Sequence, residues 1–136
     1  MIVQFVFADL AAYSVPADSF VLRVPTEIKS KVDLFNALAR EGKFPDYFGA
    51  NWDALLDCLC DFSWISEKKI VMIHDDVPLR SSVVDCFNYL DSLRIAVDDW
   101  MKAEGFTGNK ISMNHQLQVV FPAGAQSTVL NVLQNK

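Results

Sequence analysis

The chain has 136 residues, of which 51% are hydrophobic and 21% charged, and it carries a net charge of -5 at pH 7. This length and composition are typical of one folded domain, here taken as residues 1–136, and they exclude a wholly disordered chain. The negative charge disfavours nucleic acid, whose phosphates are bound through Lys and Arg, and it favours a basic protein partner.

The cysteines and the N-terminus indicate a compartment. Cys58, Cys60 and Cys86 are odd in number, and the first two lie two residues apart on a predicted helix, where they point in different directions. We therefore expect no disulfide framework and a reducing cytosol. The apolar N-terminus lacks a basic region and contains Gln4 and Asp9, so it does not resemble a signal peptide, and no apolar run is long enough to span a bilayer.

Strand and helix patterns alternate along the chain. The predicted elements are a strand at 2–7, a connection at 9–18 with a short helical turn at 10–13, a strand at 20–24, a helix from Ser30 to about Arg40, a loop at 42–50, a helix from Trp52, a strand at 69–74, a turn at 75–80, a helix from Ser81 or Ser82 to about Glu104, a polar connection at 106–116, a strand at 117–121 and a short helix within 125–136. The near-continuous apolar run at 69–74 is typical of a parallel strand buried on both faces. The alternation predicts an α/β fold with a small parallel sheet packed by helices.

The stretch from Phe44 to Trp64 contains no Lys or Arg. We expect Gly49 to adopt a positive φ and Asn51 to be the N-cap of the helix that follows. Apolar residues at helical spacing then form one stripe that should face the core. The members of this stripe are Trp52, Leu55, Leu56, Leu59 and Phe62.

Three aspartates follow the opposite face of this predicted helix. Asp53, Asp57 and Asp61 recur every four residues, a spacing at which like charges repel by roughly 0.2–0.5 kcal/mol per pair. Only Asp53, in the first turn, is favoured by the helix dipole. Local stability therefore does not explain the row, although a solvated face is the usual explanation of a charge pattern taken by itself.

The same stretch resembles the signature of the barstar family of intracellular ribonuclease inhibitors. The family pattern is Pro-acid-Tyr-aromatic-Gly-x-Asn-x-Asp-Ala-Leu-x-Asp-x-Leu. The matching residues are Pro45, Asp46, Tyr47, Phe48, Gly49, Asn51, Asp53, Ala54, Leu55, Asp57, Cys58 and Leu59. The resemblance implies a barstar-like core over 20–121, preceded by an extension at 1–19 with an extra strand and followed by a tail at 122–136.

The resemblance also implies a function. In barstar-like inhibitors the two aspartates and the loop tyrosine enter the active site of a basic ribonuclease and take the place of substrate phosphate. This implies a cytoplasmic protein without catalytic activity, cofactor or metal, whose partner is a basic ribonuclease or a related nuclease toxin. The residues expected to bind that partner are Tyr47, Gly49, Asn51, Asp53, Leu56, Asp57 and Asp61.

The chain departs from the family pattern at two positions. Leu56 stands where barstar has a Trp, and Trp100 falls near the place of an acidic contact on the last helix, with two aspartates at 98–99 beside it. An aromatic at Phe62 or Trp64 could restore contact area at the rim. These departures leave open an immunity or adaptor protein of the same fold with a different partner.

A second interpretation uses the end of the strand at 69–74. Ligands of α/β proteins bind at the carboxyl ends of strands, so His74, Asp75 and Asp76 could serve a small metal-dependent hydrolase. No second His lies at ligand spacing, which disfavours this alternative. We expect His115 at the surface and Cys58 as a packed, reduced thiol.

Overall fold

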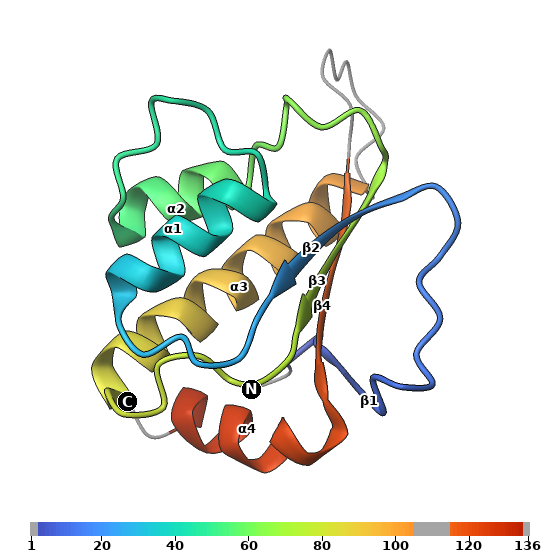
Figure 1. Cartoon of the computed structure of the whole chain (residues 1–136). Helices are drawn as coiled ribbons and strands as arrows, with labels where there is room; N and C mark the ends of the chain where they lie inside the picture. Colours follow the sequence, from blue (N-terminus) through green and yellow to red (C-terminus); the bar gives the residue numbers. More distant parts are fainter. Residues whose placement is uncertain (1–2, 105–114, 135–136) are drawn as a thin grey trace.

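The computed structural model describes residues 3–104 and 115–134 and is drawn in Figure 1. Its elements are β1 (Val6–Ala8), β2 (Ser19–Val24), α1 (Lys31–Glu41), α2 (Trp52–Leu59), β3 (Lys69–His74), α3 (Val83–Glu104), β4 (Gln116–Pro122), the 3₁₀ turn η1 (Ala123–Ala125) and α4 (Gln126–Gln134). The predicted α/β class and the extra N-terminal strand are confirmed, but the strand is shorter than the predicted 2–7, since β1 begins at Val6 and residues 3–5 are not part of it. The start of the 2–7 strand, most of the 106–116 connection and the last two tail residues lie outside the described residues.

The four strands form one parallel sheet in the order β1-β4-β3-β2. The central strand β3 pairs with β2 over six positions and with β4 over five. It is buried along most of its length, as its continuous apolar sequence predicts. The N-terminal strand β1 pairs with β4, so the extension widens the sheet beyond the three core strands.

The two faces of the sheet are covered differently. Helices α1, α2 and α3 lie on one face, and α4 crosses the carboxyl ends of the strands (Figure 1). Alternate strand residues such as Leu22 and Met72 face the helices, whereas Val71 and Ile73 face the other side, where Tyr13 packs. The Tyr13 hydroxyl donates a hydrogen bond to the Gln118 side chain. The connection at 9–18 therefore covers the face that has no helix.

The connection at 9–18 contains a turn rather than the predicted helical turn at 10–13. A single backbone hydrogen bond joins Ala12 N to Asp9 O at 3.0 Å, and the Asp9 carboxylate accepts from Ala11 N. An aspartate side chain that bonds to backbone two residues on stabilises a turn and competes with helix.

The prediction that His115 lies at the surface is wrong. Only 1% of His115 is exposed, and its ring packs edge-on against Phe62 and Trp100. Its Nε2 lies 2.8 Å from Phe62 O and its Nδ1 lies 3.3 Å from Lys68 O. The polar sequence around His115 gave no sign of this burial, which is possible because each ring nitrogen lies near a backbone carbonyl inside the fold and the one that carries the proton can donate to it.

Candidate functional site

The helix α2 is held by its apolar stripe. Leu55 and Leu59 are fully buried, and Trp52 and Leu56 pack against the core while remaining partly exposed. The indole N–H of Trp100, on α3, donates to the Leu59 carbonyl at 2.8 Å and satisfies one of the orphan acceptors at the helix end. The predicted stripe is confirmed, and the opposite face of α2 points outward.

The start of α2 is fixed by a side-chain cap. Asn51 Oδ1 accepts from the backbone N–H of Ala54 at 2.8 Å, as predicted for an N-cap. The expected positive φ at Gly49 is wrong: none of the described glycines has one, and Ala50 adopts φ 51° instead. What Gly49 provides is space, since a Cβ there would lie 3.3 Å from Asn51 Nδ2 and would press on the cap.

Replacing Asn51 with alanine should lower the free energy of unfolding by about 1 kcal/mol, because the Ala54 N–H loses its acceptor. Urea denaturation followed by circular dichroism measures the change. Asn51→Asp is the matched control, since it keeps an acceptor and adds a charge that the helix dipole favours, so it should be close to wild type. Equal losses in the two variants would contradict a capping role.

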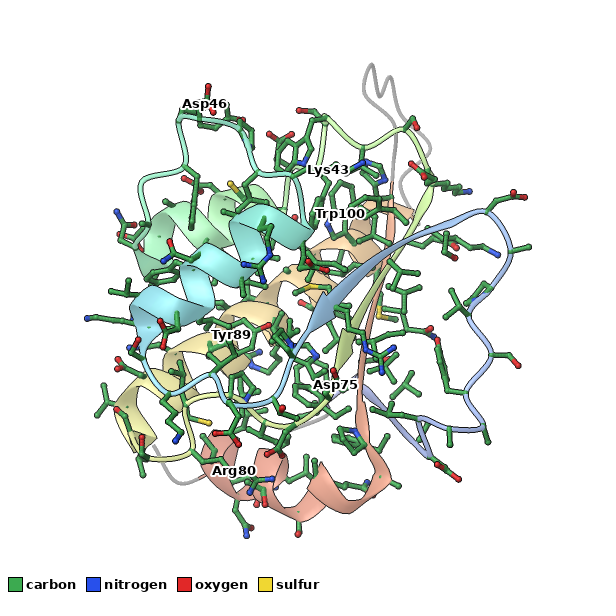
Figure 2. The ribbon with its side chains drawn as sticks, in the orientation of Figure 1. Lys43, Asp46, Asp75, Arg80, Tyr89 and Trp100 are labelled. Carbon is green, nitrogen blue, oxygen red and sulfur yellow. The ribbon has the colours of Figure 1, made fainter. Side chains whose placement is uncertain are left out.

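The three predicted aspartates are all exposed, but they do not all lie on the helix. Asp53 and Asp57 lie on α2, which ends at Leu59, and Asp61 lies in the turn after the C-cap Cys60. The loop before the helix brings Tyr47, with 72% of its surface exposed, close to this turn. We name Tyr47, Asp53, Asp57 and Asp61 the acidic surface. Figure 2 shows Asp46 at the tip of the same loop, projecting away from the body.

A small hollow of about 120 Å³ lies within the acidic surface. It is lined by Tyr47, Phe48, Ala54, Asp57, Cys58 and Asp61. Asp53 does not line it. The loop, the helix and the turn after the helix therefore each contribute to one concave site.

The carboxylates of the acidic surface have no cationic neighbour within the described part of the chain. Ion pairs there join Asp75 to Arg23, Asp76 to Arg80, Asp91 to Arg94 and Asp98 to Lys102, but none includes Asp53, Asp57 or Asp61. These carboxylates affect the thiol of Cys58. Burial raises its pKa most, the charges of Asp61 and Asp57 raise it further, and the result is a pKa of about 11. Partial desolvation and then the charge of Asp61 raise the pKa of Tyr47. Both groups stay protonated at neutral pH.

The helix α3 adds one further carboxylate next to this surface. Burial, and then the charge of Asp99 and a hydrogen bond to it, raise the pKa of the Cys60 thiol to about 12. Asp98 is instead paired with Lys102 at 3.0 Å, and Trp100 is buried. Asp99 is thus a carboxylate of α3 that lies close to Cys60, at the end of α2. The sequence shows two aspartates at 98–99, but which of them lies next to α2 depends on how α2 and α3 pack together.

Comparison with known families gives a direct match. The family model described as Barstar (barnase inhibitor) matches residues 20–117. The chain belongs to the barstar family. The resemblance seen in the sequence is confirmed. None of the curated proteins matches the chain.

The two aromatics considered for the rim have other roles in this barstar family member. Phe62 is fully buried, so it offers no area to a partner, and the expectation for it is wrong. Trp64 is partly buried and donates its indole N–H to Gly42 O at 2.9 Å, which ties the turn after α2 to the end of α1. Leu56 packs against the core. The large exposed aromatic at this surface is Tyr47.

The three residues of the hydrolase alternative are engaged elsewhere. His74 is fully buried, with Nδ1 3.1 Å from Val120 O and Nε2 2.6 Å from the Tyr89 hydroxyl. Asp75 and Asp76 form ion pairs of 2.7 and 2.8 Å with arginines. Over the residues that the structure describes, no group of three His, Cys, Asp or Glu side chains could hold a metal ion.

Among the described residues, no helix is both long enough and apolar enough to cross a bilayer. The three cysteines are free thiols, and Cys58 is buried as expected. Burial also raises the pKa of Cys86 to about 11, so this thiol remains protonated at neutral pH.

Proposed function

We propose that this protein inhibits a basic ribonuclease, or a related nuclease toxin, by placing its acidic surface in the active site of that enzyme. The observation that carries the proposal is the set of exposed carboxylates on and after α2, which lack cations of their own within the described residues, in a chain of the barstar family. The residues assigned to the contact are Tyr47, Gly49, Asn51, Asp53, Leu56, Asp57 and Asp61.

The charges suit this task. A ribonuclease holds substrate phosphate with Arg, Lys or His, and carboxylates form charge-assisted and often bidentate hydrogen bonds with such groups. A concentrated negative surface also steers a positive partner toward productive encounter, an effect for which the barnase complex of barstar itself is the standard example. The repulsion between Asp53 and Asp57, one turn apart on α2, would be relieved when the cations of the enzyme arrive.

The other members have supporting roles in the proposal. Tyr47 offers an exposed ring and hydroxyl to the partner, and Leu56 offers a small apolar contact at the helix face. Gly49 and Asn51 position the carboxylates, because the space at Gly49 allows the cap that begins α2. The protein would act in the reducing cytosol of the cell that makes it, which agrees with its three free thiols.

The test is RNA cleavage by a small basic ribonuclease of the barnase type, titrated with the wild type and with Asp57→Ala. We expect stoichiometric loss of activity with the wild type and an inhibition constant raised about 10- to 150-fold in the variant, because a hydrogen bond to a charged group contributes roughly 1.5–3 kcal/mol. Asp9→Ala is the matched control, since it changes the net charge equally on a connection that lies on the other face of the sheet.

Two results would contradict this assignment. If Asp57→Ala and Asp9→Ala inhibited equally well, the acidic surface would not be the contact. If the wild type left the ribonuclease fully active at micromolar concentration, a pull-down comparing the wild type with Asp57→Ala would identify the partner. A captured protein that is not a nuclease would support the immunity or adaptor alternative, for which the absence of a large aromatic at Leu56 is the relevant observation.

A further inference from the structure

The strand β2 forms one edge of the sheet, and this edge is long. β2 pairs with β3 over six positions on one side, and the described residues place no strand on its other side (Figure 1). The opposite edge is formed by β1, which has only three residues. A short edge strand offers little to another chain, whereas a long one presents a row of unpaired N–H and C=O groups. The edge of β2 is therefore the more open one.

The pairing with β3 identifies the unpaired backbone groups of β2. The Val24 carbonyl accepts a hydrogen bond from Asp75 N at 2.9 Å, just beyond the end of β3, so the backbone groups of Val24 point toward β3. Neighbouring residues of a strand direct these groups to opposite sides. Ser19, Val21 and Arg23 therefore direct their N–H and C=O groups away from the sheet. Within residues 3–104 and 115–134, no hydrogen bond satisfies these outward groups.

Nothing within β2 blocks pairing along this edge. Edge strands of natural proteins are commonly protected by Pro, by Lys or by a bulge. The sequence of β2 is SFVLRV, which contains neither Pro nor Lys, and its register with β3 has no interruption. Its one charged residue, Arg23, is paired with Asp75 at 2.7 Å. A second strand could therefore add to this edge without leaving an unpaired charge at the contact.

A second copy of β2 matches the edge when it runs antiparallel. If Val21 lies opposite Val21 of the second copy, then Ser19 lies opposite Arg23 and Arg23 opposite Ser19. All three positions direct their backbone groups outward, so each pair exchanges two hydrogen bonds and the edge gains about six. The side chains also agree, since the two partly exposed valines meet and the two arginines stay apart.

We propose that two copies of this chain associate weakly through β2, in an antiparallel pairing centred on Val21 that joins their two four-stranded sheets into one. The contact is isologous, so it closes at two copies and does not propagate. A single strand pair is a small interface, and each copy carries a net charge of -5, so we expect a dissociation constant on the order of 100 μM. This dimer is independent of the proposed function.

Salt separates this association from binding to a basic partner. Screening reduces the repulsion between two negatively charged copies, so the dimer should become tighter as the ionic strength is raised. The attraction between the acidic surface and a basic enzyme should weaken under the same conditions. Sedimentation velocity of the wild type over a range of protein and salt concentrations measures the association.

Amide exchange tests the pairing residue by residue in the wild type. Exchange with water is measured by NMR at about 50 μM and about 1 mM protein, between which the paired fraction should rise from roughly 40% to roughly 80%. The amides of Val21 and Arg23 should then exchange about threefold more slowly at the higher concentration. The amide of Leu22 points toward β3 within its own sheet, so its rate should be the same at both concentrations.

Charge variants at residue 21 test the axis of the dimer. Val21→Lys and Val21→Glu each place like charges directly opposite one another and should raise the dissociation constant about three- to tenfold. An equal mixture of the two variants places opposite charges there and should associate within about twofold of the wild type. Val15→Lys is the matched control, since Val15 is 40% exposed against 39% for Val21 but lies before the strand, and it should not weaken association. The amide spectrum of each variant shows that it is folded.

Three results would overturn the inference. They are a wild type that stays monomeric at about 1 mM, a Val21 amide whose exchange does not slow with concentration, and a mixture of the two charge variants that associates no better than either alone. A monomeric wild type would leave this edge to a strand of another protein. A protein that forms the dimer but inhibits no ribonuclease keeps the dimer and loses the proposed function, and a monomer that inhibits does the reverse.

Discussion

Replacing Phe62 with alanine is expected to lower the free energy of unfolding by about 3–5 kcal/mol, measured by urea denaturation. The ring is fully buried, and its centroid lies 5.5 Å from that of Trp64 and 6.3 Å from those of Phe44 and His115. Alanine would leave a cavity among three aromatic rings that belong to three separate segments. Phe62→Leu is the control, since it keeps most of the buried volume and should lose much less.

The backbone of Phe62 makes this prediction sharper. Its φ is 47°, in the left-handed region that costs an L-residue roughly 1–2 kcal/mol and that glycine adopts freely. Alanine at this position keeps the strain and loses the ring, whereas glycine loses the ring and also releases the strain. Phe62→Gly should therefore be at least as stable as Phe62→Ala, the reverse of their usual order. A glycine variant clearly less stable than the alanine variant would contradict the strained conformation.

The position of Phe62 also matters for binding. It directly follows Asp61, so the buried ring fixes the turn that places this carboxylate beside Tyr47. A strained residue held by burial next to an exposed functional group is a recurrent arrangement at binding sites. The same substitutions should therefore weaken recognition through Asp61 even under conditions in which the variants remain folded.

Much of the fold could be predicted from the sequence because the local signals agree with one another. The continuous apolar strand at 69–74, the Ser30 and Asn51 caps and the apolar stripe of α2 each specify one structure, and each is found. The signals failed where the outcome depends on packing between distant segments. His115 is expected at the surface because its sequence neighbours are polar. It is buried, because the carbonyls of residues 62 and 68 lie next to its ring nitrogens inside the fold.

In the candidate site, too, local patterns predict some residues and packing alone places others. The exposure of Asp53 and Asp57 follows from helical spacing, and the structure shows it. The position of Asp61 could not follow from spacing, since the helix ends at Leu59 and the chain then turns. The approach of Asp99 to Cys60 likewise depends on how α3 crosses α2, which no local pattern encodes. Sequence therefore predicts which residues are charged and exposed, and the fold decides which of them share a pocket.

A buried histidine should make the protein sensitive to acid. Because the Val120 carbonyl can only accept, Nδ1 of His74 carries the proton and Nε2 accepts from the Tyr89 hydroxyl, so the folded protein holds the neutral ring (Figure 2 shows Tyr89 on α3). Burial lowers the pKa of His74 to about 4 from its ordinary value of 6.5, against the smaller raising effects of the Val120 and Met72 carbonyls and of Asp75. Between these two values the unfolded chain binds a proton that the folded chain does not.

The free energy of unfolding should therefore fall as the pH is lowered. The contribution of His74 is fully present above about pH 6.5 and is lost as the pH falls toward about 4, a change on the order of 3 kcal/mol. Carboxylates also titrate in this range. Burial raises the pKa of Asp76, but its bonds to Arg80 and to the backbone N–H of Val77 lower it by more, so the pKa is below its ordinary value. Asp76 therefore adds to the same loss of stability in acid. The effect of His74 itself is isolated by comparing the wild type with His74→Gln, which keeps hydrogen-bonding groups but does not titrate.

The wild type and His74→Gln should differ in how their free energies of unfolding change with pH. His74→Gln should be less stable than the wild type at pH 8, because glutamine fits the site between Val120 and Tyr89 imperfectly, but it should lose less stability between pH 7 and pH 4. Urea denaturation at half-unit pH steps measures both curves. Parallel curves would show that His74 does not titrate differently in the two states. His74 is fully buried, whereas Asp57 is exposed on α2, so the two sites should act independently. We therefore expect the acid sensitivity to persist in Asp57→Ala. Such a result would separate the stability of the fold from the charge of its binding site.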